Sequence, residues 1–234
     1  MTKPIPVSEI FPAVQGEGPL LGHPTVFVRT GGCDYRCAWC DSLHAVLPDH
    51  KTEWTPMMPG EIMARVLTLT NGQPILLTLS GGNPAIHAQL GDLVDLAQTN
   101  RCQVAIETQG SVVRPWFAGL DYVVLSPKPP SSGMTTNWGH LRQCVEAAKG
   151  APVFLKVVVF DDNDYQYARN VARMFPFLPF YLQVGNHTPA TNVDMPGLLA
   201  RLRWLCEKVL ADRWYSAIVT PQMHTLIYGN ERGR

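Results

Sequence analysis

Residues 25–42 read TVFVRTGGCDYRCAWCDS and place three of the chain's six cysteines, Cys33, Cys37 and Cys40, within one short loop. The spacing C-x3-C-x2-C lets such a loop turn all three sulfurs towards one point, as a metal ion or cluster requires. Three thiolates would leave one iron of a four-iron cubane without a protein ligand, and that open position could bind a small molecule. Zinc would instead need a fourth protein ligand, and His44 lies close enough in sequence to supply it.

Clustered cysteines also have interpretations that involve no metal, namely a disulfide framework or redox-active thiols. An odd number of cysteines in one short loop suits a disulfide framework poorly. The N-terminus lacks the apolar run of a signal peptide, and no apolar stretch approaches membrane length. We therefore expect a cytoplasmic protein, in which clustered cysteines are more often metal ligands than disulfides. The scattered Cys102, Cys144 and Cys206 have apolar neighbours in sequence and are expected to be packed core thiols.

The composition of the whole chain limits the kinds of partner that it can have. Its 234 residues are 46% hydrophobic, so the chain can bury a full core, and we expect one domain over residues 1–234. Nineteen basic and nineteen acidic residues leave no net charge, which gives no reason to expect binding to nucleic acid or to anionic membranes. An anionic ligand would have to be bound by a local cation.

Continuous apolar runs recur along the chain and are typical of strands that are buried on both faces. Strands are expected at residues 25–30, 75–79, 104–106, 122–125, 153–160, 180–184 and 217–219. Helical spacing of apolar residues predicts helices at 61–69, 85–98, 138–149, 165–175 and 198–210. This alternation predicts a parallel α/β sheet, either closed as a barrel or open. Residues 49–59 are expected to be a surface connection. Residues 10–18 would form either a plain Gly-rich turn or a segment in which the backbone at Gln15 and Glu17 approaches a ligand closely.

Polar, charged and glycine residues follow most of the expected strands. They are Ser80-Gly81-Gly82-Asn83-Pro84, Glu107-Thr108-Gln109-Gly110, Ser126-Pro127-Lys128, Gln183-Val184-Gly185-Asn186 and Thr220-Pro221-Gln222-Met223-His224. The carboxyl ends of parallel strands meet at one rim, which is where α/β proteins bind their ligands. The cysteine loop follows strand 25–30, so we expect it to share one site with these segments.

These motifs together resemble those of the radical S-adenosylmethionine enzymes, and among them the 7-carboxy-7-deazaguanine synthase family. The three-cysteine motif is similar to the superfamily signature, while Gln15-Gly16-Glu17-Gly18 and Ser126-Pro127-Lys128 narrow the resemblance to the synthases. Further matching segments are Ile10-Phe11, Phe27-Val28-Arg29, Gly31-Gly32-Cys33, Cys40-Asp41-Ser42, Ser80 to Pro84, Glu107 to Gly110, Leu155-Lys156-Val157-Val158 and Gln183 to Asn186. The resemblance covers nearly the whole chain.

The resemblance implies a fold and an activity. The implied fold is α/β, a shortened parallel β/α barrel of the TIM-like radical S-adenosylmethionine type. The implied enzyme is a lyase that converts 6-carboxy-5,6,7,8-tetrahydropterin to 7-carboxy-7-deazaguanine with release of ammonia, a step towards the transfer-RNA nucleoside queuosine. The implied cofactors are a [4Fe–4S] cluster, S-adenosylmethionine and Mg²⁺, and the implied partners are a second copy of the chain and an electron donor such as flavodoxin or ferredoxin.

Residue roles follow from the same resemblance. Cys33, Cys37 and Cys40 would ligate the cluster, and Ser42 would ligate magnesium. Contacts with S-adenosylmethionine are implied for Trp39, Cys40, Asp41, Gly82, Ser126, Pro127, Lys128, Gln183, Val184, Gly185 and Asn186. Contacts with the pterin are implied for Val14, Gln15, Gly16, Arg29 and Ser80, with Arg29 facing the substrate carboxylate. Glu107 is the implied catalytic residue, handling protons near the substrate.

Several points stay open at this stage. Lys156 would either face the barrel interior with an acidic partner or extend outward to solvent, and His224 is a weak candidate for a substrate contact. Asn83 stands where many superfamily members carry glutamate, and its amide brings no charge. The role of the segment 228–234 is undecided. The alternative functions are a small activase that forms a glycyl radical on a partner protein, and a zinc-bearing binding module.

Overall fold

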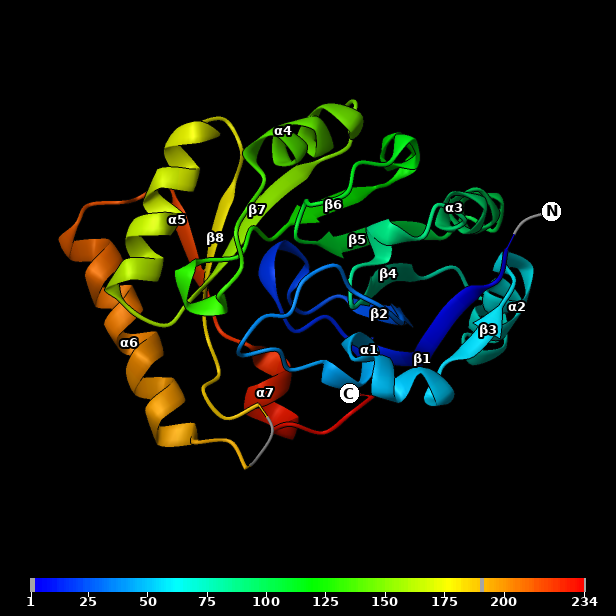
Figure 1. Ribbon diagram of the computed structural model, residues 1–234, viewed down its shortest axis with the longest axis horizontal. Coiled ribbons are helices and arrows are strands. Elements are labelled where there is room, and N and C mark those ends of the chain that lie inside the picture. Colours follow the sequence, from blue (N-terminus) through cyan, green and yellow to red (C-terminus); the bar gives the residue numbers. More distant parts are fainter. Residues whose placement is uncertain (1–2, 190–191, 234) are drawn as a thin grey trace.

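A single nine-stranded sheet organises the computed structural model, which describes residues 3–189 and 192–233. Its strands lie in the order β3-β1-β2-β4-β5-β6-β7-β8-β9 (Figure 1). The strands are β1 (Ile5–Val14), β2 (Pro24–Thr30), β3 (Thr55–Met57), β4 (Leu76–Gly81), β5 (Gln103–Thr108), β6 (Tyr122–Leu125), β7 (Val153–Val159), β8 (Phe180–Val184) and β9 (Ala217–Thr220). Neighbouring strands from β2 to β9 are all parallel, whereas β1 is antiparallel to both β2 and β3.

The sheet is curved as in a partial barrel, and within the described residues no strand pairing joins β3 to β9. The predicted α/β fold with a parallel sheet is therefore confirmed, in its partial form. The helices are α1 (Leu43–Val46), α2 (Pro59–Leu69), α3 (Leu90–Thr99), α4 (Trp138–Ala147), α5 (Asp162–Met174), α6 (Met195–Ala211) and α7 (Met223–Tyr228). Helices α2 to α6 lie around the outside of the sheet, while α1 and α7 lie near its open side (Figure 1). None of the described helices has the length and hydrophobicity needed to span a membrane.

Strand alternation decides which side chains reach the interior of the partial barrel. On β7, Leu155, Val157 and Val159 belong to the main hydrophobic core. Because successive residues of a strand point to opposite faces, Lys156 and Val158 point the other way, and both line the central cavity. The sequence left the direction of Lys156 open, and the structure places its side chain inside with acidic partners.

Some elements differ from those that the sequence predicted. Strand β1 was not expected, and its residues 10–14 lie in the segment 10–18 for which a turn was considered, because a partly buried antiparallel strand lacks the continuous apolar run of the parallel strands. The expected surface connection at 49–59 contains strand β3. The helix expected at 85–98 begins only at Leu90, after a short 3₁₀ turn over Pro84–Ile86. Helix α5 begins at Asp162, ahead of the expected start, because the Asp161 side chain caps it by accepting from Asp164 N at 2.9 Å.

The expected core thiols are confirmed for two of the three scattered cysteines. Cys102 and Cys144 are buried in the main core, whereas Cys206 on α6 is only partly buried. All three are free thiols.

A buried carboxylate fastens α5 to the loop that follows β6. Asp164 is fully buried, and it accepts hydrogen bonds from Ser131 N at 3.0 Å, Ser131 Oγ at 2.6 Å and Phe160 N at 3.0 Å. Ser131 Oγ also accepts from Trp39 Nε1 at 2.9 Å. The carboxylate thereby holds the loop that supports Trp39 in the cysteine loop.

We expect Asp164→Ala to lower the free energy of unfolding by about 3 kcal/mol, because it leaves buried donors without an acceptor. Asp162→Ala, on the same helix, is the matched control. Its carboxylate is exposed and pairs with Lys208, so its loss should cost about 1 kcal/mol or less. Urea unfolding of the two variants measures both values, and equal losses would contradict the role given to Asp164.

Candidate functional site

The cysteine loop leaves the carboxyl end of β2 and borders a cavity inside the partial barrel. Cys33, Cys37 and Cys40 are free thiols, and all three line this cavity. Tyr35 N donates to Cys33 Sγ at 3.4 Å and Gln109 Nε2 donates to the same sulfur at 3.7 Å. Burial raises the pKa of all three thiols, and that of Cys40 to about 12. A nearby positive metal centre would be needed to ionise them at neutral pH.

The two kinds of metal centre place different demands on the ligands. Among the described residues, the three cysteine sulfurs do not form a set in which all lie within 4.8 Å of one another. One zinc ion with bonds of about 2.3 Å would hold its sulfurs about 3.8 Å apart. His44, the fourth ligand considered for zinc, has its Nε2 3.2 Å from Glu9 Oε2. His44 is therefore engaged by Glu9, whereas the three thiols of the loop line the cavity.

Gly32 and Gly82 allow the loop after β4 to pack closely against the cysteine loop. A Cβ at Gly82 would lie 2.1 Å from Gly32 O and 3.0 Å from Cys33 Cβ. Gly82 N donates to Thr30 O at 3.1 Å, and Asn83 N donates to Gly32 O at 2.9 Å. Only glycine leaves room for this approach of one backbone to another, and Gly82 borders the cavity beside Cys33.

Asn83 holds this junction together from behind the cavity. Its side chain is fully buried, and Oδ1 accepts from Thr108 Oγ1 at 2.7 Å. Its Nδ2 donates to Asp34 Oδ1 at 2.8 Å and to Ser111 Oγ at 3.1 Å. A glutamate could not donate to Asp34. The amide at this position therefore serves a structural network that joins three loops.

Arg29 at the end of β2 belongs to a polar chain along one wall of the cavity. Its Nε lies 3.0 Å from Glu9 Oε2, and its Nη1 donates to Ser42 Oγ at 3.0 Å. Ser42 Oγ donates in turn to Asp41 Oδ1 at 2.8 Å. Burial raises the pKa of Glu9, but its hydrogen bond to His44 and the charge of Arg29 lower it overall. The Arg29 guanidinium lines the cavity, where a ligand can reach it.

The C-terminal segment closes onto the same polar chain. Arg232 Nε lies 3.4 Å from Glu9 Oε1, and Arg232 Nη2 lies 3.6 Å from Glu53 Oε2. Asn186 Nδ2 donates to Asn230 Oδ1 at 2.9 Å. The segment left undecided by the sequence therefore connects β1 with the loop after β8.

The floor of the cavity carries buried charge. Lys156 Nζ donates to Glu17 Oε2 in a short contact and lies 3.9 Å from Glu107 Oε2. Gln15 Nε2 donates to Glu107 Oε1 at 2.9 Å, and Gln222 Nε2 donates to Glu17 Oε1 at 2.9 Å. The glutamine at 222 was not selected from the sequence, because its chemistry appears only when α7 is folded against the loop after β1.

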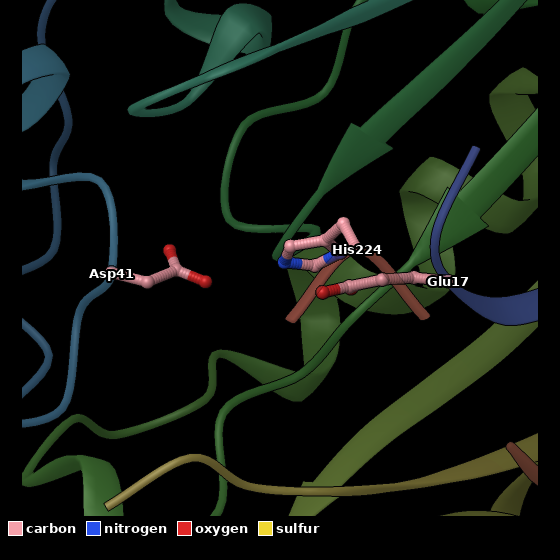
Figure 2. A group of neighbouring side chains, drawn as sticks. All are labelled: Glu17, Asp41 and His224. Atoms are coloured by element: carbon pink, nitrogen blue, oxygen red, sulfur yellow. The ribbon is translucent and has the colours of Figure 1, made fainter. Parts of the chain in front are cut away.

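Glu17, Asp41 and His224 come together from three separate segments, and each offers a ligand atom within 4.8 Å of the others (Figure 2). His224 packs on the backbone at Gly16, where a Cβ would lie 2.5 Å from His224 Nδ1. Because Glu17 is held by the Lys156 ammonium, we assign no cation to this group. The group instead shows that the cysteine loop, the loop after β1 and α7 share one cavity.

Trp39 forms part of the cavity wall beside Cys40. Its ring centroid lies 5.1 Å from that of Phe160, and the Lys128 ammonium lies 5.9 Å from the Trp39 ring centroid. Lys128 Nζ also donates to Ser126 Oγ at 3.2 Å. Phe160 was missed in the sequence, where it appeared only as the end of an apolar strand.

Most of the residues selected from the sequence line this one cavity. They are Val14, Gln15, Gly16, Arg29, Cys33, Cys37, Trp39, Cys40, Asp41, Ser42, Ser80, Gly82, Glu107, Ser126, Lys128 and Asn186. Pro127, Gln183, Val184 and Gly185 are not among its lining residues. A Cβ at Gly185 would lie 2.2 Å from the Phe160 ring, so this glycine leaves space for Phe160. Ser80 Oγ is buried and has no hydrogen-bond partner among the described residues, as expected of a group that awaits a ligand.

We expect Gly82→Ala to prevent assembly of the metal centre, because its Cβ would push the cysteine loop away from the loop after β4. Anaerobic reconstitution followed by iron and sulfide analysis measures this loss. Gly60→Ala is the matched control, since a Cβ there meets nothing within 4 Å and alanine favours the helix. Full iron content in the Gly82 variant would show that the close approach of the loops is dispensable.

Comparison with known proteins places the chain in a family. No family model matches it. The 7-carboxy-7-deazaguanine synthase of Bacillus subtilis (strain 168) is 42% identical over 100% of both chains. That of Bacillus cereus is 41% identical over 98% of both chains.

Solved structures show the same fold. QueE from Escherichia coli superimposes with a TM-score of 0.66 at 23% identity, covering 94% of this chain and 95% of that one. Streptococcus suis SuiB bound to S-adenosylmethionine gives a TM-score of 0.57 at 16% identity, covering 84% of this chain and 50% of that one. With full-length relatives above 40% identity and three cysteines beside one cavity, the chain belongs to the 7-carboxy-7-deazaguanine synthase family of radical S-adenosylmethionine enzymes.

Proposed function

We propose that this chain is a lyase that converts 6-carboxy-5,6,7,8-tetrahydropterin to 7-carboxy-7-deazaguanine with release of ammonia, on the way to queuosine. One observation carries the proposal beyond membership of the family. The three thiols share a single cavity with an arginine, a serine without a partner and a buried carboxylate. A carboxylated bicyclic ring needs these groups around it, whereas an activase acting on a partner protein does not.

Cluster and cofactor are held at the cysteine side of this cavity in our proposal. The family implies a [4Fe–4S] cluster and S-adenosylmethionine, and the free thiols of Cys33, Cys37 and Cys40, which line one cavity, suit the cluster. When bound, the two groups together supply the electron and the radical that start the reaction. S-adenosylmethionine would lie against Trp39, Cys40, Asp41, Gly82, residues 126–128 and residues 183–186. Of the last two segments, Ser126, Lys128 and Asn186 line the cavity directly.

The substrate occupies the opposite side. Arg29 meets the pterin carboxylate with its guanidinium, which lines the cavity beside Glu9 and Ser42. Val14, Gln15, Gly16 and Ser80 contact the ring edges. Glu107 lies beside Gln15 and handles a proton at its carboxyl group. The Trp39 and Phe160 rings form an apolar wall that keeps water from the reacting atoms.

Magnesium would be bound at Ser42. The hydroxyl oxygen of Ser42 and the carboxylate of Asp41 lie together at the cavity, and Mg²⁺ prefers oxygen ligands supplied in part by substrate and water. We further propose a single domain over residues 1–234, a homodimer, and reduction by flavodoxin or ferredoxin. These three points rest on the family resemblance.

The activity is tested with anaerobically reconstituted protein, the carboxy-tetrahydropterin, S-adenosylmethionine, Mg²⁺ and a reductant. We expect 7-carboxy-7-deazaguanine and 5′-deoxyadenosine, both measured by liquid chromatography and mass spectrometry. Omitting Mg²⁺ should slow product formation while iron content stays the same. Cleavage of the cofactor without any deazaguanine would reject the proposed substrate and favour another radical enzyme.

Arg29→Ala should raise KM for the pterin roughly tenfold or more, since a charge-assisted hydrogen bond contributes about 1.5–3 kcal/mol. Cleavage of S-adenosylmethionine without turnover should be retained, because Arg29 lies on the substrate wall. Arg203→Ala is the control, as this arginine is exposed and pairs only with Glu207 among the described residues. A parallel loss of cofactor cleavage and substrate turnover would contradict the role of Arg29.

A further inference from the structure

Two carboxylates share one ammonium at the floor of the cavity. Glu17 follows β1, Glu107 lies on β5 and Lys156 lies on β7, so three strands deliver the groups to one place. Their side chains are 15%, 23% and 5% exposed, respectively. Burial at this level makes each unpaired charge costly, and one ammonium can compensate only one carboxylate.

The geometry shows which carboxylate the ammonium compensates. Lys156 Nζ is in direct hydrogen-bond contact with Glu17 Oε2, and Glu17 Oε1 accepts from Gln222. Glu107 Oε2 is 3.9 Å from the same Nζ, which is beyond hydrogen-bond distance. Glu107 Oε1 accepts from Gln15 Nε2. No donor among the described residues reaches Glu107 Oε2, although this side chain lines the cavity.

The charged groups around Glu17 and Glu107 determine which of these two carboxyl groups is protonated. They are Lys156 on β7, Glu17 after β1, His224 on α7, Lys128 after β6 and Asp41 in the cysteine loop. Burial and the charge of Glu17 raise the pKa of Glu107, and the opposing effect of Lys156 does not restore it. The pKa of Glu17 is lowered despite its burial, chiefly by Lys156. The pKa of Glu107 is therefore raised and the pKa of Glu17 is lowered, as happens when two like charges share a buried site.

We propose that Glu107 meets the pterin ring as a neutral carboxylic acid, donating a hydrogen bond from Oε2 to an acceptor atom of the ring, and that Glu17 keeps it neutral by holding Lys156. Glu17 and Lys156 are then positioning residues that act through Glu107. The ring-binding part rests on the proposed function, whereas the neutral state of Glu107 does not. This assigns a protonation state and two supporting residues to a position known so far only as a candidate for proton handling.

Infrared spectroscopy tests the neutral state in the reconstituted enzyme without substrate. At neutral pH the wild type should show the C=O stretch of a buried protonated carboxyl group, and Glu107→Gln should remove it. Glu17→Gln should remove it as well, because Lys156 then pairs with Glu107 and the net charge of the group is unchanged. Glu146→Gln, at an exposed position on α4, should leave the band in place. A wild type without the band, or a band that survives Glu107→Gln, overturns the proposal.

Binding of 6-carboxypterin to the reconstituted enzyme with S-adenosylmethionine tests the donated hydrogen bond. Since the pKa of Glu107 is raised, the neutral form persists above the ordinary range and is lost as pH rises through the raised pKa. We expect affinity to fall roughly tenfold across that step. Glu107→Gln should bind within about threefold of the low-pH wild type at all pH values, because its amide donates in place of the acid. Glu17→Gln should move the loss of affinity to lower pH.

Two other outcomes distinguish a failure of this inference from a failure of the proposed function. If affinity rises with pH and Glu107→Gln abolishes binding, Glu107 acts as an ionised acceptor and the inference is wrong, while the proposed substrate stands. If the wild type binds no pterin at any pH, the proposed substrate fails together with the hydrogen bond to it. In that case the infrared band still shows whether Glu107 is neutral.

Discussion

The structure depends on a contact between two backbones at the carboxyl ends of β2 and β4. Gly82 lies so close to Gly32 that a Cβ would come within 2.1 Å of the Gly32 carbonyl oxygen. Hydrogen bonds from Gly82 N to Thr30 O and from Asn83 N to Gly32 O fasten the same junction. This contact fixes the start of the cysteine loop relative to the sheet. Because the loops after β5, β6 and β8 also leave carboxyl ends, fixing one loop places the thiols in a common cavity with the others.

Charge is balanced locally around this cavity, in a chain that carries no net charge. Glu9 pairs with Arg29 on one wall, and Glu17 pairs with Lys156 on the floor. Such buried pairs add little net stability, because desolvation offsets most of their attraction. They instead hold in place the groups that would meet a ligand, namely the guanidinium of Arg29 and the carboxyl group of Glu107. Glu107 is the second carboxyl group beside Lys156, and it is the group that we propose to be protonated.

The sequence predicts the parallel strands well, because strands covered on both faces leave continuous apolar runs, as at Phe180–Val184. It misses β1, whose burial alternates and whose two prolines suggest a turn. The cysteine loop and most cavity residues follow from motifs, since they lie next to strand ends. The pairing of Glu17 with Lys156 cannot be predicted in this way, because the two are 139 residues apart. The continuous apolar run around Lys156 leaves the direction of its side chain open, and only the structure places it inside the cavity.

In the proposed enzyme, Cys33, Cys37 and Cys40 hold a four-iron cluster with one iron left open to S-adenosylmethionine. Mössbauer spectroscopy of protein reconstituted with ⁵⁷Fe, recorded before and after addition of S-adenosylmethionine, tests it most directly. We expect a four-iron cluster in which one iron site changes its signal when the cofactor binds. A cluster whose irons are all unaffected by the cofactor, or thiols that retain zinc and no iron, would contradict it.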